Sequence, residues 1–267
     1  MLALIAGQGA LPAILANRLD AQGEPYVLAA LKDSPPDALH RPVDFTIDMT
    51  DLGRFFADLK SCGTTKVAMA GAVSRPDFEH ANDTISEAAR RAKRAGDDGL
   101  LKVIVGLFEN QGIQVVAAHE LVPELLPAAG VTGGVHPTTD HSADAARAQS
   151  VQRAVGALDI GQACVVSAGQ VLAIETDFGT AAMLEALAAQ RKGARGGIFY
   201  KAPKPGQERR ADLPIIGPET IHQVAQAGLD GLVIEAGGVM VLDQKAVQGA
   251  LLRNELFLWV RPNEGSI

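Results

Sequence analysis

The sequence has few of the features that stabilise secreted or membrane proteins. It contains only 2 cysteines, Cys62 and Cys164, which lie far apart beside small or apolar residues. This usage argues against a disulfide framework and favours reduced thiols in a cytoplasmic protein. No uncharged stretch approaches the roughly 18 to 20 residues that span a bilayer. The N-terminal MLALIAGQGALP lacks the basic region of a signal peptide. We therefore expect a soluble, cytoplasmic protein.

Positive charge and the common catalytic motifs are also scarce. The formal net charge is −7, so nucleic acid is not expected as a partner, and an anionic ligand must be held by local groups. The chain has no G-x-S-x-G, H-E-x-x-H or G-x-x-x-x-G-K-[ST] motif. The α/β-hydrolase, zinc peptidase and P-loop classes are therefore not indicated. The 6 histidines are scattered, and His136 and His141 are interpreted as loop residues rather than ligands.

The residues that are present predict an α/β protein. The 267 residues are 47% hydrophobic and 21% charged, a globular composition long enough for two domains. In the first half, short apolar runs alternate with helical periodicity, which is typical of a doubly wound, Rossmann-like parallel sheet. The expected strands are 2–6, 26–31, 44–48, 66–70 and 114–117, and the expected helices are 11–22, 51–61 and 97–109.

A composition shift predicts where the first domain ends. Prolines and glycines interrupt the pattern between residues 123 and 140, and a helix with Ser142 as its N-cap is expected to follow. We place an N-terminal Rossmann-like domain at 1–134 and a C-terminal mixed α/β catalytic domain at 135–267. Ligands tend to bind in the cleft between two such domains, so we expect an inter-domain cleft here.

The second half has a different order of expected strands and helices. A hairpin, two helices and three further strands are expected. The hairpin strands are 163–166 and 171–175, the helices are 179–190 and 218–227, and the further strands are 197–201, 231–235 and 239–242.

A glycine turn follows the first expected strand and opens the first helix. The residues are Gly7, Gln8, Gly9, Ala10 and Leu11, and backbone N–H groups in such a turn suit a phosphate. The third glycine of a dinucleotide fingerprint is missing, and no acidic residue clearly ends the second strand. NAD is therefore not indicated. The turn either lies near a nucleotide or sugar, or is a tight turn without a ligand.

Two pairs of acidic residues precede helices. Asp97 and Asp98 could hold a cation such as Mg²⁺, or could cap the helix that follows them. Glu175 and Asp177 would share one face if their strand continued that far, with Thr180 close behind. They are candidate metal ligands or the polar rim of a turn.

A proline-rich basic loop, residues 201–220, carries the most specific pattern. Lys201 and Lys204 stand beside Pro203 and Pro205, which would reduce the entropy that the lysines lose on meeting a phosphate. Asp212 precedes Leu213-Pro214, which favours an extended backbone, and the neighbouring arginines favour an ionised carboxylate. The alternative is a solvated surface loop.

An ordered set of segments over nearly the whole chain resembles one family. The segments are LIAGQGALP (4–12), AGAVSRP (70–76), GDDGLLKVI (96–104), HELVPELLPAAG (119–130), ALDIGQACVV (157–166), IETDFGTAAM (174–183), the loop 201–220 and EAGGVMVLD (235–243). Together they are similar to the UDP-2,3-diacylglucosamine pyrophosphatases of lipid A biosynthesis that are not metallophosphoesterases, the LpxI family.

This resemblance implies an activity and its partners. It implies Mg²⁺-dependent hydrolysis of UDP-2,3-diacylglucosamine to UMP and 2,3-diacylglucosamine 1-phosphate (lipid X), with water attacking the β-phosphorus. It also implies two domains that enclose the substrate, and a homodimer. Because the substrate is amphiphilic, we expect peripheral contact with the inner membrane. The alanine- and leucine-rich segments 119–130 and 181–190 could cover the acyl chains, or could be plain core.

The resemblance also assigns residues. It implies that Lys201 and Lys204 stabilise the diphosphate charge and that Asp212, with Glu175 or Asp177, holds Mg²⁺ or orients water. The remaining matches are expected to bind substrate. They are Gly7, Gln8, Gly9, Ala10, Leu11, Gly71, Arg75, Thr180 and Gln207.

One position departs from the family pattern. Ala181 stands where the pattern has an aspartate after Gly179-Thr180. If that aspartate is a metal ligand, this chain is expected to bind substrate and turn it over poorly.

Two other functions fit the same residues. One is a nucleotide-sugar transferase or another non-hydrolytic nucleotide-sugar enzyme; a transferase would leave the diphosphate intact without an acceptor. The other is a non-catalytic receptor for a nucleotide sugar or an acylated sugar.

Overall fold

The computed structural model describes residues 1–73 and 97–262, which form two compact units. Unit 1 comprises Met1–Pro123 and Glu208–Asp212, and unit 2 comprises Glu124–Gln207 and Leu213–Ile267. The chain therefore returns to unit 1 for a short segment in the middle of unit 2. The units first divide between Pro123 and Glu124, earlier than the predicted boundary after residue 134.

A strand that the sequence analysis did not predict explains this earlier division. Strand β6 (Gly130–Gly133) pairs with β13 (Phe257–Arg261), antiparallel, in the sheet of unit 2. Its two terminal glycines weaken the strand signal, because glycine has low strand propensity. A segment interpreted as irregular is in fact an edge strand.

The sheet of unit 1 is parallel throughout, as predicted for a Rossmann-like domain. Its order is β3-β2-β1-β4-β5, and every neighbouring pair is parallel. The strands are β1 (Leu2–Ala6), β2 (Tyr26–Leu31), β3 (Phe45–Ile47), β4 (Lys66–Ala70) and β5 (Gln114–Val115).

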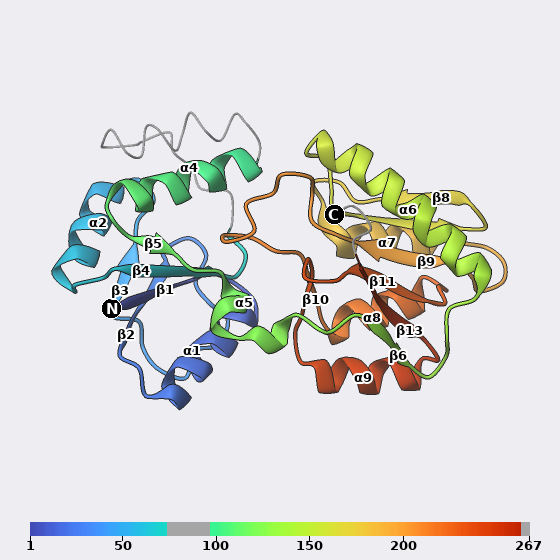
Figure 1. The fold of residues 1–267 in the computed structure, drawn as a ribbon, viewed down its shortest axis with the longest axis horizontal. Coiled ribbons are helices and arrows are strands. Elements are labelled where there is room, and N and C mark those ends of the chain that lie inside the picture. The colour runs from blue at the N-terminus through green and yellow to red at the C-terminus, as the bar shows by residue number, and fades with distance from the viewer. Residues whose placement is uncertain (74–96, 263–267) are drawn as a thin grey trace. The chain divides into compact units, whose positions relative to one another are not determined.

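Helices cover both faces of this sheet. The helices α2 (Leu52–Ser61) and α4 (Asp97–Asn110) lie on one side, and α1 (Leu11–Gln22) and α5 (Ala118–Leu121) lie on the other (Figure 1). Alternate strand residues face α2 and α4, as the period of two requires. Phe56 and Phe108 pack edge to face in that layer, with ring centroids 5.2 Å apart.

The sheet of unit 2 is mixed, which confirms the predicted class of the second domain. Its order is β6-β13-β11-β9-β7-β8, in which β9, β11 and β13 are parallel and the other pairs are antiparallel. A short parallel pair, β10 with β12, lies outside this sheet. The remaining bounds are β7 (Ala163–Ser167), β8 (Gln170–Ile174), β9 (Ile198–Lys201), β10 (Ile215–Ile216), β11 (Gly231–Glu235) and β12 (Met240–Val241).

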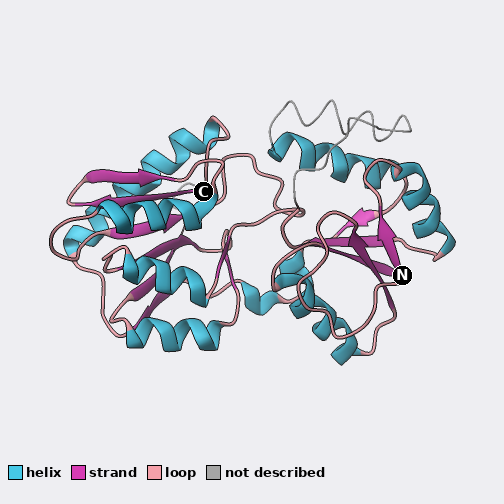
Figure 2. Cartoon of the chain, turned by 180° about the vertical axis from the view of Figure 1, so that it is seen from behind, coloured by secondary structure: helices cyan, strands magenta, loops and turns pink. Residues whose placement is uncertain are grey.

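In the described part of the chain, the helix α6 (Thr139–Ala157) covers one face of this sheet and three helices cover the other. α6 packs on Cys164, Tyr200 and Val233, and burial raises the pKa of the Cys164 thiol to about 12. Leu184, Val224 and Leu251 pack on the opposite face. Figure 2 shows the helices around the strands from behind. The bounds are α6 (Thr139–Ala157), α7 (Gly179–Gln190), α8 (Pro218–Gln226) and α9 (Gln244–Arg253).

Helix α6 begins earlier than predicted. Its N-cap is Thr138, whose Oγ1 accepts a hydrogen bond from the N–H of His141, while His141 Nδ1 accepts one from the N–H of Thr138. Ser142 lies inside the first turn, so its prediction as the N-cap was wrong. The reciprocal cap uses a histidine, where a capping box usually has Glu or Gln, and this substitution hid the helix start.

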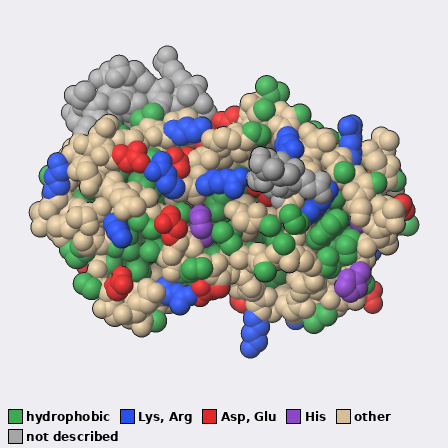
Figure 3. Space-filling model, viewed as in Figure 1, with side chains coloured by type: hydrophobic (Ala, Val, Ile, Leu, Met, Phe, Trp, Pro, Cys, Tyr) green, Lys and Arg blue, Asp and Glu red, His purple; other side chains and the backbone are tan. Residues whose placement is uncertain are grey.

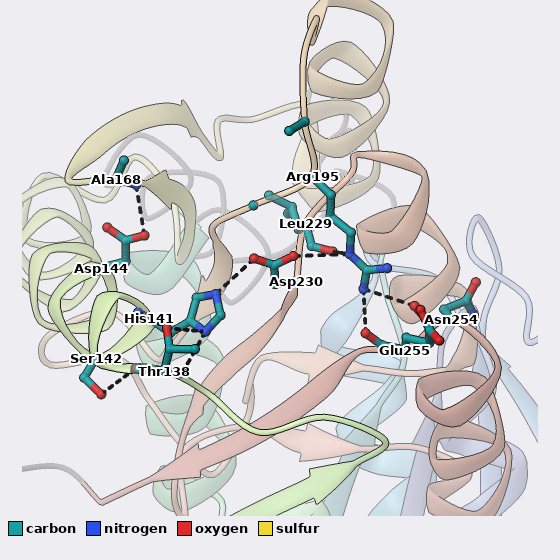
Figure 4. A network of polar contacts seen from close by, with 12 residues as sticks. Thr138, His141, Ser142, Asp144, Ala168, Arg195, Leu229, Asp230, Asn254 and Glu255 are labelled. Carbon is teal, nitrogen blue, oxygen red and sulfur yellow. Dashed lines mark hydrogen bonds and ion pairs between the residues drawn. The ribbon is translucent and has the colours of Figure 1, made fainter.

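His141 also belongs to a network at the amino ends of the parallel strands (Figure 4). Its Nε2 lies 3.0 Å from Asp230 Oδ2, and Arg195 Nε lies 3.3 Å from Asp230 Oδ1. Because Nδ1 accepts the backbone N–H, the proton of the neutral ring lies on Nε2 and points at Asp230. Asp230 directly precedes β11, so this network ties α6 to the sheet at the edge opposite the strands' carboxyl ends.

Candidate active site

In unit 1, the loops after β1 and β4 meet at the point where the strand order reverses. Gly7 N–H donates to Ala70 O at 2.8 Å, and Gln8 and Ala72 exchange two backbone hydrogen bonds of 2.9 Å. In open α/β sheets, ligands bind at this switch point, beyond the carboxyl ends of the strands. The glycine turn therefore lies where the fold class places a ligand.

Glycine is required at two positions of this junction. A Cβ on Gly7 would lie 2.5 Å from Ala72 O, and a Cβ on Gly71 would lie 2.5 Å from Gln8 O. Gly71 also has a φ of 94°. The structure thus brings Gly7, Gln8 and Gly71 together. Two other predicted ligand residues are placed differently: Leu11 is buried at the start of α1, and the N–H of Gly9 donates to Asp37 Oδ2 at 2.8 Å.

An apolar cavity of about 290 Å³ opens at this edge of the sheet within unit 1. Most of its lining comes from the ends of the strands and from α2 and α4. Among the described lining residues, polar groups are few: the glycine backbone at the junction and the carboxylate of Asp212. The lining includes Gly7, Gly71, Leu101, Phe108 and Asp212.

The segment Glu208–Asp212 is fastened to α4. Glu208 N–H donates to Asp98 Oδ1 at 2.9 Å, and Arg210 binds Glu109 at 2.6 Å and Glu208 at 2.8 Å. The hydrogen bonds from Arg210 lower the pKa of the Glu208 carboxyl, and the same contacts raise the pKa of Arg210. These contacts hold Asp212 at the cavity. Arg210 thus pairs with the two glutamates, and Asp98 fixes this segment.

In unit 2, a buried polar chain lies at the end of β9. Lys201 and Glu175 are each 6% exposed. Lys201 Nζ donates to Thr180 Oγ1 at 2.9 Å and to Ile215 O at 3.2 Å. Thr180 Oγ1 donates to Glu175 Oε1 at 2.5 Å, and Glu175 Oε2 accepts from the N–H of Gln162 at 2.9 Å. Three residues predicted from the sequence therefore form one network.

The loop after Lys201 is fixed, not loosely solvated. Gln152 of α6 is buried and donates to Ala202 O at 3.2 Å and Pro203 O at 3.0 Å. Lys204 forms an ion pair with Asp159, and its N–H donates to Gln207 Oε1 at 2.8 Å. Gln207 therefore braces the loop, and the ammonium of Lys204 has a carboxylate partner.

The sequence analysis missed two charged residues at this edge. Glu235 ends β11, the neighbour of β9, and Arg261 ends β13, which pairs with β11 on its other side and places Arg261 opposite Glu235. Glu235 is buried. A signal was available, since IFYK, GLVIE and FLWVR are three apolar runs that each end in a charge. Parallel strands bring such terminal charges to one edge.

The predicted metal ligands do not form a preformed cation site in the described ranges. β8 ends at Ile174, so Glu175 and Asp177 do not share a strand face, and Asp177 is exposed in a turn. Both oxygens of Glu175 already accept hydrogen bonds. Across residues 1–73 and 97–262, no group of three or more His, Cys, Asp or Glu could hold a metal ion. Arg75 lies outside these ranges.

A second apolar hollow, of about 420 Å³, lies between β8 and α7 in unit 2. Leu172, Ile174 and Phe178 contribute to it and are exposed, Phe178 by 86%. Leu158, 73% exposed, follows α6, at whose end apolar side chains reach the surface (Figure 3).

The segment 119–130 forms only the short α5 and a 3₁₀ turn before β6, so it provides no long helix to cover acyl chains. None of the helices that could be placed is long and apolar enough to cross a membrane.

The fold and these edges define an α/β protein of two units, one with an apolar cavity and one with a buried lysine network. Residues 1–125 match the model of the LpxI N-terminal domain, and residues 128–259 match that of the LpxI C-terminal domain. The chain belongs to the LpxI family.

Individual proteins were also compared with this chain. The protein named UDP-2,3-diacylglucosamine pyrophosphatase LpxI from Caulobacter vibrioides is 40% identical over an alignment of 279 positions, which covers 98% of each chain. The solved structure of glycinamide-RNase-transformylase T from Mycobacterium tuberculosis is 18% identical over 64% of this chain and 43% of that one. Its TM-score of 0.23 is too low to support an argument.

Proposed function

We propose that this protein hydrolyses the diphosphate of UDP-2,3-diacylglucosamine and releases UMP and lipid X in lipid A biosynthesis. The name of the relative that is 40% identical over almost the full length of both chains supports this substrate. The structural observation that carries the proposal is the apolar cavity of unit 1 with Asp212 in its lining. An amphiphilic substrate needs apolar cover for its acyl chains beside a group that can act on the diphosphate.

The proposed chemistry rests on positioning and electrostatics. Phosphoryl transfer requires that the attacking water be oriented and that negative charge on the phosphate oxygens be stabilised. Asp212 is the carboxylate proposed to orient the water. Lys201 is the proposed partner of the diphosphate, and its hydrogen bond to Thr180 orients its ammonium group. Lys204 adds positive charge to the same loop.

A requirement for Mg²⁺ is part of this proposal. Mg²⁺ usually binds one or two carboxylates together with phosphate oxygens of the substrate, so it does not need a cage of protein ligands. Asp212 is the acidic residue of the predicted set that lines the cavity. Removing divalent cations with EDTA should abolish UMP release, and adding Mg²⁺ should restore it. Full activity in EDTA would contradict the requirement.

The activity test uses the diacylated UDP-sugar with the full chain. We expect UMP and lipid X to form in equal amounts. A transferase would leave the diphosphate intact without an acceptor, and a receptor would bind the substrate without turnover. Ala181, exposed in the first turn of α7, is tested in the same assay: Ala181→Asp should raise turnover if the missing aspartate matters. Persistent binding without turnover in both forms would favour the receptor.

We also propose that the exposed apolar residues around β8 contact a lipid bilayer, which would place this cytoplasmic protein on the inner membrane. Leu158, Ile174 and Phe178 are the test positions, and the amphiphilic substrate supplies the reason. Sedimentation with phosphatidylglycerol–phosphatidylethanolamine vesicles should be lost in Phe178→Ser.

The homodimer implied by the family resemblance is tested by light scattering. If Phe178→Ser changes the mass and not the vesicle binding, a second copy covers this surface.

A further inference from the structure

We propose that Glu175 is a positioning residue for Lys201, acting through the hydroxyl of Thr180, and that it does not ligate a metal ion. This inference deepens the proposed function and rests on it where it concerns turnover. It reassigns a residue that the sequence pattern suggested as a metal ligand. The observation behind it is a chain of hydrogen bonds from the Lys201 ammonium through Thr180 Oγ1 to the Glu175 carboxylate.

The chemistry of the three groups fixes the direction of this chain. An ammonium can only donate hydrogen bonds, so Thr180 Oγ1 accepts from Lys201 at 2.9 Å. A hydroxyl has one proton, and that proton is directed at Glu175 Oε1, 2.5 Å away. Only an acceptor at position 175 completes this arrangement. The carboxylate therefore determines where the hydroxyl lone pair, and with it the ammonium, can lie.

Glu175 is itself held from several sides. Its second oxygen accepts from the N–H of Gln162 at 2.9 Å, and its own N–H donates to Ala163 O at 2.9 Å. Gly161 lies so close that a Cβ there would be 2.2 Å from Glu175 O. The carboxylate is thus fastened to the start of β7. A side chain with both oxygens engaged in this way is suited to orient its neighbours, because a cation would have to compete with the existing donors.

The charge balance of the site supports the same role. Lys201 and Glu175 are each 6% exposed, so neither charge is well solvated. A buried charge is tolerated when an opposite charge and hydrogen bonds compensate it, and removing one partner leaves the other uncompensated. Hydrogen bonds through Thr180 link the Glu175 carboxylate to Lys201. Its replacement should therefore change the position or the charge of Lys201.

The first experiment measures kinetics with Glu175→Gln, which keeps the shape and removes the charge. We expect kcat to fall at least tenfold, while KM and the Mg²⁺ concentration for half-maximal activity stay within threefold. Lys201→Met should lower kcat as well, and adding Glu175→Gln to Lys201→Met should cost little more, because both act through one ammonium. Glu185→Gln, on the exposed side of α7, is the matched control.

Thr180 gives a second pair of variants in case Glu175→Gln folds poorly. Thr180→Val removes the hydroxyl with little change in shape, and Thr180→Ser retains it. Thr180→Ser should keep more activity than Thr180→Val. Equal losses in these two variants would overturn the inference, and so would multiplicative effects of Glu175→Gln and Lys201→Met. A tenfold shift in the Mg²⁺ requirement of Glu175→Gln would identify Glu175 as a metal ligand instead.

A stability cycle separates this inference from the proposed function. If the wild-type chain releases no UMP, the proposed function fails, and the link between Glu175 and Lys201 is still measurable by urea unfolding. We expect Glu175→Gln to raise the unfolding equilibrium constant about a hundredfold, because it removes the buried carboxylate that is linked to the Lys201 ammonium through Thr180. In the double variant Glu175→Gln with Lys201→Met, the unfolding equilibrium constant should rise by less than the product of the two single-variant increases. Independent, multiplicative effects would show that the two residues are not coupled.

Discussion

The two units present the carboxyl ends of parallel strands in chemically different ways. In unit 1, the edge consists of glycine backbone and an apolar cavity, and its carboxylate Asp212 arrives on a segment from elsewhere in the chain. In unit 2, the strands themselves end in charged residues, and Lys201 is buried with a carboxylate linked through Thr180. One edge is suited to cover acyl chains and the other to hold a charged group.

This difference shows how one kind of sheet edge can serve two purposes. Binding in an apolar cavity is stabilised by the apolar surface that the ligand and the lining bury, and it needs few precisely placed polar groups. A buried charge is useful only when neighbouring groups compensate it and fix its direction. The substitutions that disturb the two edges should therefore have different kinetic signatures.

The largest effect is expected from Asp212→Asn. This change removes the carboxylate proposed to orient water and leaves the apolar lining intact. We expect kcat to fall about 10²- to 10⁴-fold, the usual contribution of a general acid or base, while the substrate still binds. Product release measured by chromatography and binding measured by calorimetry test the two parts. Asp33→Asn, at an exposed loop position, is the control; a similar loss there would contradict the assignment.

A smaller effect is expected from Asp144→Ala, which weakens unit 2 far from Lys201. Asp144 is buried in α6 and accepts from Gly169 N–H at 2.7 Å and Ala168 N–H at 3.1 Å, in the turn between β7 and β8. Losing these two hydrogen bonds to a carboxylate should cost about 2 kcal/mol of unfolding free energy.

The single tryptophan, Trp259 in β13, makes this measurement specific for unit 2. Urea unfolding followed by its fluorescence should shift in Asp144→Ala and shift less in Asp144→Asn, which keeps one acceptor. A change of kcat larger than the change in folded fraction would show that the hairpin also affects the chemistry.

The cavity itself is tested by Leu101→Trp, which places a larger side chain in its wall. If the indole displaces two methylene groups of an acyl chain, at about 0.8 kcal/mol each, binding of the diacyl substrate should weaken about tenfold. A substrate with short acyl chains should be affected much less. Equal effects on both substrates would mean that the acyl chains bind elsewhere, for example beside α7.

The smallest effect concerns pH and the segment that carries Asp212. Arg210 lowers the pKa of Glu208 below its ordinary value of 4.5. A depressed carboxyl pKa stabilises the folded state above that value, and the contribution is lost as pH falls through the folded pKa. Arg210→Gln should therefore reduce the acid sensitivity of unfolding below pH 4.5 and change little at neutral pH. An unaltered acid profile would show that this ion pair does not fasten the segment.

Much of the fold follows from the sequence because its periodicity is strong. The first strands and helices of unit 1 and the hairpin of unit 2 lie where alternation and helical spacing predict them. The misses have local causes. Glycines concealed β6, and an unusual histidine cap concealed the start of α6. Strand β8 ends at Ile174, whereas the metal interpretation required it to continue to Asp177.

The sequence by itself determined the two α/β units, the need for glycine at the first turn and the identity of the charged residues in the loop after β9. Only the tertiary structure decided how these residues are used. In the folded protein, Asp212 lines the cavity of unit 1, and hydrogen bonds through Thr180 link Lys201 to Glu175. The physical reason is that periodicity reports which face of one element is buried. Partners far apart in the chain are fixed by packing between elements and by the pairing of buried charges.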